Sequence, residues 1–76
     1  MRIKDLREDA DLSQTALAEY LNVKQNTYSQ YENGKRQIPI ECLIKLAQYY
    51  HVSTDYLLEL TDVREPYPAS KRNKML

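Results

Sequence analysis

The segment spanning residues 24–35, KQNTYSQYENGK, is rich in side chains that form hydrogen bonds without carrying a charge. In a helix, successive side chains turn by about 100°, which places the tyrosines of this segment on one side and most of its amides on the other. The amide side holds Gln25, Asn26 and Gln30. Lys and Glu are better helix formers and would keep a surface solvated at less cost, so the amides indicate recognition of another molecule through hydrogen bonds.

Residues suited to catalysis or metal binding are scarce. The chain has one His and one Cys, too few for the three or four ligands of a zinc site, and no glycine-rich loop that could hold a phosphate. A nucleophile would need a base beside it, and His51 is expected at the end of a helix. We therefore expect no enzyme activity, no metal, no cofactor and no small-molecule substrate.

The composition is that of one small globular domain. At 76 residues, with 42% hydrophobic and 29% charged residues, the chain can bury only a small core. No run approaches the roughly 18 apolar residues of a membrane span, and the N-terminus lacks the apolar centre of a signal peptide. Cys42 has no partner within the chain for a disulfide. These features favour a cytoplasmic protein that does not bind a membrane.

The charges balance, with eleven Lys and Arg against eleven Asp and Glu. A net charge of zero argues mildly against a nucleic-acid partner, because phosphate binding needs a positive surface. The distribution nevertheless leaves local basic stretches, at Lys35 and Arg36 and again at Lys71, Arg72 and Lys74. A basic face on a neutral protein is therefore compatible with this chain.

The spacing of the apolar residues predicts five helices, the first over about residues 2–10. Boundary residues of the expected types are Ser13 before the second helix, Gly34 at the end of the third, Pro39 at the start of the fourth, and Ser53 or Thr54 before the fifth. The fifth helix is expected to be short and to include Leu60. Together the helices make a domain of residues 1–62, followed by a flexible basic tail over residues 63–76.

The chain has a single glycine, although five helices joined by tight turns need several left-handed backbone positions. Asp11, Asn22 and His51 stand where the first, second and fourth helices should end. Asp, Asn and His are the residues other than glycine that are found most often at positive φ. We therefore expect these three residues to be left-handed.

The second and third helices, joined by a turn of about three residues, form a helix-turn-helix pattern. Gln and Asn can bond to adenine at N6 and N7, so an exposed row of amides on a helix that fits the major groove can read bases. The N-terminal residues of the second helix of such a pair meet the bases. Here those residues are Gln25, Asn26 and Thr27, with Gln30 one turn further on.

At these residues the sequence resembles the lambda-repressor and Cro-like helix-turn-helix family. The stretches LSQTALAEYLNVKQNTYSQYENGKRQIP and LIKLAQYYHVSTDYLL follow that family's pattern, and the resemblance covers about residues 2–60. The combination of LSQ, LA, YENGK, the following Pro and DYLL, in this order, is highly specific for this family. The resemblance implies an all-α fold, a compact five-helix DNA-binding domain.

Carried over residue by residue, the resemblance also implies roles for side chains. Contacts with base edges are implied for Gln25, Asn26 and Gln30. Contacts with the DNA backbone are implied for Gln14, Thr27, Lys35 and Arg36, and Gln14 would also brace the recognition helix. Arg7 and Glu32 match a buried ion pair of many family members. The role of such a pair is to fix how the first helix packs against the end of the third, more than to add net stability.

The sequence departs from the family pattern at three positions. Lys24 stands where Ser or Thr commonly caps the recognition helix, and Lys cannot accept the free backbone N–H groups there. Our hypothesis is that Lys24 reaches a DNA phosphate instead. Tyr28 replaces a small aliphatic residue in the middle of the helix, which leaves the tilt of the helix open. Ile40 replaces a polar cap at the fourth helix.

The sequence thus predicts a sequence-specific transcriptional regulator that binds double-stranded DNA, with repression as the expected effect. One helix reads only a few base pairs, so we expect a homodimer on an inverted-repeat operator with half-sites about one helical turn apart. The expected dimer surface is the fifth helix, with Leu58 and Leu60, together with the tail. The alternative is a protein interaction module of the same fold with weak DNA binding, for example an antitoxin or a regulator's partner, which the neutral charge favours slightly.

Overall fold

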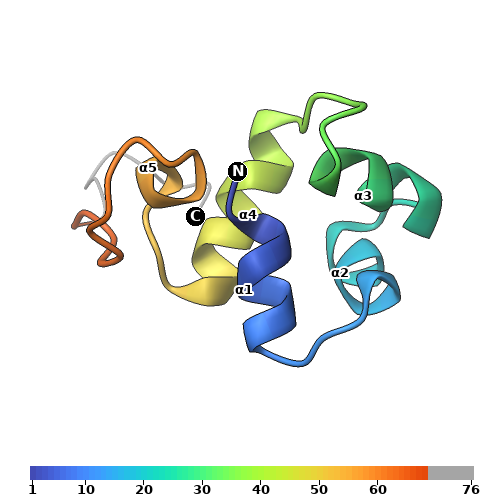
Figure 1. Ribbon diagram of the computed structural model, residues 1–76, viewed down its shortest axis with the longest axis horizontal. Helices are drawn as coiled ribbons and strands as arrows, with labels where there is room; N and C mark the ends of the chain where they lie inside the picture. The colour runs from blue at the N-terminus through green and yellow to red at the C-terminus, as the bar shows by residue number, and fades with distance from the viewer. Residues whose placement is uncertain (69–76) are drawn as a thin grey trace.

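The computed structural model describes residues 1–68, and this part of the chain folds into five helices (Figure 1). They are α1 (Ile3–Asp9), α2 (Gln14–Leu21), α3 (Gln25–Glu32), α4 (Ile40–Tyr50) and α5 (Thr54–Leu57). No strand occurs among residues 1–68. The predicted all-α, five-helix fold is therefore confirmed.

One apolar core joins the five helices. In Figure 1, α2 and α3 lie at one end of the longest axis, α5 lies at the other end, and α1 and α4 lie between them. Each helix contributes one side chain with at most 1% of its surface exposed: Ile3, Leu17, Tyr28, Leu46 and Leu57. Full burial of one such side chain stabilises a fold by about 1.5–3 kcal/mol, so each helix is held by its own anchor in the core.

Two helices begin at serine caps, as predicted. Ser13 Oγ accepts a backbone N–H of the first turn of α2 at 3.1 Å, and Ser53 Oγ does the same for α5 at 3.0 Å. Pro39 is the N-cap of α4, with an extended backbone. Ile40 is therefore the first residue of α4 and not its cap, and its side chain is 67% exposed.

All five helices end in the same way, with a left-handed residue and a hydrogen bond that reaches back over the last turn, known as a Schellman motif. The left-handed residues are Asp11 (φ 56°), Asn22 (φ 58°), Gly34 (φ 77°), His51 (φ 54°) and Glu59 (φ 63°). In every case the next N–H donates to the carbonyl five residues earlier, over 2.9 to 3.0 Å. The prediction for Asp11, Asn22 and His51 is confirmed, and Gly34 lies one residue beyond the C-cap Asn33.

The fifth helix is shorter than predicted. It ends at Leu57, and the left-handed backbone of Glu59 separates Leu60 from it. Glu has no special preference for positive φ, so the sequence did not mark this end. In the structure the carboxylate of Glu59, the left-handed residue of this turn, accepts a hydrogen bond from the N-terminal amine of Met1 at 2.9 Å.

The chain after α5 returns toward that helix. The Ser53 N–H donates to the carbonyl of Arg64 at 3.0 Å, and the Tyr67 hydroxyl donates to Asp55 Oδ2 at 3.3 Å. The basic residues near the C-terminus lie outside the described residues. The division of the chain after residue 62, with a flexible tail beyond it, stays a prediction. Within residues 1–68, no helix is both long enough and apolar enough to cross a membrane.

Candidate nucleic-acid interface

A turn of three residues, 22–24, joins α2 to α3. Asn22 has φ 58° and ψ 45°, and its N–H and that of Val23 bond back to the last turn of α2. Lys24 is extended, with φ −71° and ψ 148°, and α3 begins at the next residue. The two helices and their short turn thus have the predicted helix-turn-helix arrangement.

The two sides of α3 differ in burial. Tyr28 and Tyr31 are 0% and 7% exposed, and their rings meet edge to face with 6.5 Å between centroids. Gln25 and Asn26 are exposed at the start of the helix, and Gln30 is half-buried further along. Because the tyrosines occupy the core side, the amides face outward.

A buried ion pair fixes α3 against α1. Arg7 donates from Nε to Glu32 Oε2 at 2.7 Å and from Nη2 to Glu32 Oε1 at 3.2 Å. Its third nitrogen, Nη1, donates to the carbonyl of Leu12 at 2.9 Å. The Arg7 and Glu32 side chains are only 13% and 3% exposed. The pair that the family resemblance implied is therefore present and is bidentate, the geometry that gives such pairs directional specificity.

Burial and hydrogen bonding compete at Glu32. Burial alone would raise the pKa of the Glu32 carboxyl, but hydrogen bonds, above all that from Arg7, outweigh burial and hold this pKa below its usual value. The hydrogen bond to Glu32 also raises the pKa of Arg7. Burial, and then the nearby Glu32 carboxylate, raise the pKa of Tyr28, whose hydroxyl has no hydrogen-bond partner within residues 1–68. At neutral pH the pair is therefore fully charged and Tyr28 is neutral.

Gln14 connects this ion pair to the start of α3. Its Nε2 donates to Glu32 Oε1 at 3.1 Å, and its Oε1 accepts from Gln25 Nε2 at 3.2 Å. A carboxylate can only accept, so Gln14 turns its nitrogen to Glu32 and its oxygen to Gln25. Gln25 must then use its nitrogen toward Gln14, which leaves its oxygen and one N–H for another molecule. One buried charge thus sets the orientation of two amides.

The side chains expected near a DNA backbone lie at the two ends of α3 and at the start of α2. Lys24 is the N-cap of α3, is exposed, and makes no side-chain bond to the helix end. Thr27 is half-buried in the first turn of the helix, and Gln14 lies beside Gln25. Lys35, at the other end, is exposed in the turn after α3.

One contact on this surface was not anticipated from the sequence. Arg36 Nε donates to Gln30 Oε1 at 3.0 Å. The backbone N–H groups of Lys35 and Arg36 both bond to the Gln30 carbonyl, at 2.9 and 3.2 Å, so the chain folds back over the end of α3. No spacing rule connects a Gln to an Arg six residues later. The only local signal is Gly34, which permits the reversal.

The chemistry available on this surface is hydrogen bonding by amides and attraction by Lys and Arg. Among residues 1–68, no three His, Cys, Asp or Glu side chains are grouped so that they could hold a metal ion. The arrangement suits a ligand that offers both hydrogen-bonding edges and negative charge, as double-stranded DNA does.

The fold and this surface define a helix-turn-helix domain: two helices joined by a three-residue turn, the second anchored by tyrosines and presenting amides. A family model described as helix-turn-helix matches residues 3–57, and the chain belongs to this family. The predicted resemblance to lambda-repressor and Cro-like proteins is thereby confirmed.

Curated relatives support the same assignment. The chain is 37% identical over 75 residues to the HTH-type transcriptional regulator ImmR of Bacillus subtilis (strain 168), which covers 99% of the chain and 59% of that protein. For the HTH-type transcriptional regulator YobD of the same strain, the identity is 35% over 74 residues, 97% of the chain and 64% of the relative. The chain therefore spans about three fifths of the length of these relatives.

A phage protein is also similar. The cryptic phage CTXphi transcriptional repressor RstR of Vibrio cholerae is 41% identical over 51 residues, which is 67% of the chain and 46% of the repressor. No solved structure gave a significant match.

The Arg7–Glu32 pair predicts a specific loss of stability in acid. The folded-state pKa of Glu32 lies below its unfolded value of about 4.3, so the unfolded chain takes up the proton first as the pH falls. The stabilisation is complete above that unfolded value and is lost as the pH falls through the folded-state pKa. Urea unfolding at about pH 7 and about pH 3.5 should show a larger loss for the natural protein than for Glu32→Gln.

At neutral pH, Glu32→Gln should itself cost about 3 kcal/mol, because it leaves the Arg7 guanidinium buried without its opposite charge. The matched control is Glu19→Gln, which removes an exposed carboxylate that makes no ion pair within residues 1–68. Its acid profile should follow that of the natural protein. Equal acid profiles for Glu32→Gln and the natural protein would show that the pair does not contribute in this way.

Proposed function

We propose that this protein is a sequence-specific transcriptional regulator, with repression as its effect, that binds double-stranded DNA by placing α3 in the major groove. The hydrogen-bond chain from Glu32 through Gln14 to Gln25 carries the proposal, because it orients an exposed amide at the start of α3. Holding a reading side chain in place before binding reduces the entropy lost on binding. The similarity to transcriptional regulators, one of them a phage repressor, supports it.

In this proposal Gln25, Asn26 and Gln30 contact base edges. Gln25 keeps both an oxygen and an N–H for a base, which matches the paired groups N6 and N7 of adenine. Gln14 still has a second N–H on Nε2, and this donor would meet a phosphate. Lys24, Thr27 and Lys35 would also meet the DNA backbone, and together such contacts fix the register of α3 in the groove.

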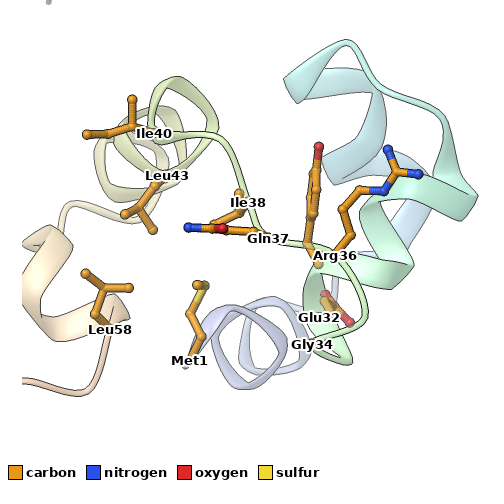
Figure 2. A pocket seen from close by; sticks show the side chains of 10 residues that line it. Met1, Glu32, Gly34, Arg36, Gln37, Ile38, Ile40, Leu43 and Leu58 are labelled. Carbon is orange, nitrogen blue, oxygen red and sulfur yellow. The ribbon is translucent and has the colours of Figure 1, made fainter.

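We further propose a homodimer on an inverted repeat, since one helix reads too few base pairs for useful specificity. An open groove of about 570 Å³ lies next to the expected dimer surface, and Met1, Ile40, Leu43 and Leu58 line its apolar part (Figure 2). Leu58 and Leu60 are 41% and 73% exposed. A second copy of the chain would cover these apolar side chains. Acting on DNA, the dimer would work in the cytoplasm, and it would perform no catalysis.

The alternative is a protein interaction module of the same fold that binds DNA weakly. The zero net charge favours it, because a neutral protein gains little from long-range attraction to phosphates. Salt separates the two functions. Several phosphate contacts make DNA affinity fall steeply with salt, whereas a protein interface responds much less.

The deciding experiment is selection of bound duplexes from a random DNA library at near-physiological salt. An enriched inverted repeat would support the regulator and would report the spacing of its half-sites. No enrichment by a protein that circular dichroism shows to be folded would contradict the proposal and favour the interaction module.

Gln25→Ala should lose about 1–3 kcal/mol of binding at its cognate base and relax the preference there. Lys35→Ala is the matched comparison: it should weaken binding to all sequences alike and reduce the salt slope by about one. Both effects can be measured by fluorescence anisotropy on the selected duplex and on single-base variants of it. The division into base-reading and backbone-binding residues fails if the two variants behave alike.

Lys24→Ser should make the protein more stable and a weaker DNA binder. Serine can cap the free N–H groups of α3, which no side chain caps now, and this should add about 1 kcal/mol of stability. Loss of a phosphate contact should reduce the salt slope by about one. Thermal unfolding and salt titrations on one preparation would measure both. Unchanged affinity and salt slope would remove Lys24 from the interface.

Leu58→Glu should dissociate the dimer and weaken binding to the inverted repeat, because two charges would face an apolar surface, while leaving the monomer folded. Tyr49→Glu is the control. Tyr49 is 42% exposed, close to the 41% of Leu58, but it packs against Tyr20 of α2 and lies outside the groove, so this variant should still form the dimer. Analytical ultracentrifugation with and without the selected duplex would measure the assembly. A Leu58→Glu dimer that binds with natural affinity would place the dimer surface elsewhere.

A further inference from the structure

Arg36 lies across the outer end of α3 and is tied to it at two levels. Its backbone N–H bonds to the Gln30 carbonyl at 3.2 Å, and its side-chain Nε bonds to the Gln30 amide oxygen at 3.0 Å. Arg36 belongs to the lining of the groove, and Figure 2 shows its side chain running along the ribbon of α3, away from the apolar side chains of Ile40, Leu43 and Leu58. None of the ion pairs within residues 1–68 involves Arg36. Its charge therefore remains available to a ligand.

The chemistry of arginine decides how the Gln30 amide is oriented. A guanidinium has only donors, so the amide must turn its oxygen to Arg36. The amide nitrogen, with two N–H groups, then forms the remaining polar edge of Gln30. The two Nη groups of Arg36 are also donors, and neither makes a hydrogen bond within residues 1–68. The Gln30 amide nitrogen and the two Arg36 Nη groups thus form a row of hydrogen-bond donors that carries the positive charge of Arg36.

We propose that Arg36 is a specificity-determining residue that, through this contact, makes Gln30 read guanine. The inference rests on the proposed function, since it names the base that one position of the DNA-reading surface selects. In the major groove, guanine presents two neighbouring acceptors, O6 and N7. These acceptors match the donors of Gln30 and Arg36.

Adenine fits this pair poorly. A lone Gln reads adenine by accepting from N6 and donating to N7. Here Arg36 already bonds to the oxygen of Gln30, and an N6 amino group that approached this oxygen would also approach the positive guanidinium. Thymine offers one acceptor, O4, and cytosine offers a donor, so both match less well than guanine.

Gln25 provides an internal contrast. Its nitrogen is bonded to Gln14, so its oxygen and one N–H stay free for a base, whereas the oxygen of Gln30 already accepts from Arg36 and both N–H groups of Gln30 stay free. Two glutamines on the same helix are therefore oriented differently by their neighbours: Gln25 uses its nitrogen within the protein, and Gln30 uses its oxygen. The residue type alone does not specify which base each would read.

The test is duplex selection with the natural protein and three variants, read position by position. Gln30→Ala identifies the base pair that Gln30 reads, because preference there should fall while other positions keep theirs. At this position the natural protein should enrich guanine. Arg36→Lys keeps the positive charge but loses the planar fork, so guanine enrichment at this position should fall by about tenfold, with adenine rising, and the salt slope should not change.

Gln30→Glu supplies an independent change. A carboxylate can still accept from Arg36 but has no N–H groups, so the preference should move from guanine toward cytosine, whose N4 amino group donates. Gln30 is half-buried on the outward side of α3 and Arg36 is exposed, and neither belongs to the buried core, so the variants should fold. Circular dichroism and thermal unfolding provide the check.

The outcomes separate this inference from the proposed function. Absence of any enriched sequence for the natural protein would overturn the proposed function, and this inference with it. An enriched repeat with adenine at the Gln30 position, or an Arg36→Lys protein with unchanged base preference, would overturn the inference and leave the function in place. If Arg36→Lys weakened all sequences alike, Arg36 would be a phosphate contact only.

Discussion

The carboxylate of Glu32 joins three helices. It receives two hydrogen bonds from Arg7 of α1 and one from Gln14 of α2, while it belongs to the last turn of α3. Removing two charges from water costs much of what their attraction returns, so the pair is worth less in net stability than its short distances suggest. The main effect of the pair is to fix the orientation of α3. A bidentate pair holds α3 at one rotation about its own axis, and that rotation decides which side chains face outward.

The rotation of α3 that the ion pair fixes also determines which of its side chains are buried. Tyr28 and Tyr31 can occupy the core side of α3 only when the amides occupy the other side. Tyr28, in the middle of this helix, is completely buried, although its hydroxyl makes no hydrogen bond within residues 1–68. Packing, ion pair and amide row therefore agree on one orientation, which is the consistency expected of a sequence that specifies a single structure.

Local features of the fold could be predicted from the sequence, and features that depend on the path of a loop could not. Ser13 and Ser53 mark helix starts because their hydroxyls bond within three residues, and Asn22 and His51 mark helix ends because of their own backbone preferences. Glu59 has no such preference, so the early end of α5 was missed. The contact of Arg36 with Gln30 depends on how the chain turns at Gly34, and residue spacing does not encode it. The ion pair was anticipated only through the family resemblance, since a separation of 25 residues has no local signature.

The left-handed turns that end the helices have a mechanical consequence. At Asp11, Asn22 and His51 the chain uses L residues where glycine would be unstrained, at a cost of roughly 1–2 kcal/mol each. Such residues have fewer backbone conformations than glycine, so these turns bend less readily. The angle between α2 and α3 then resists change. If α3 enters the major groove of an inverted repeat as proposed, a DNA groove of another width would have to adjust to the protein, and base pairs that α3 never touches would influence affinity through the energy needed to bend or narrow the duplex between half-sites.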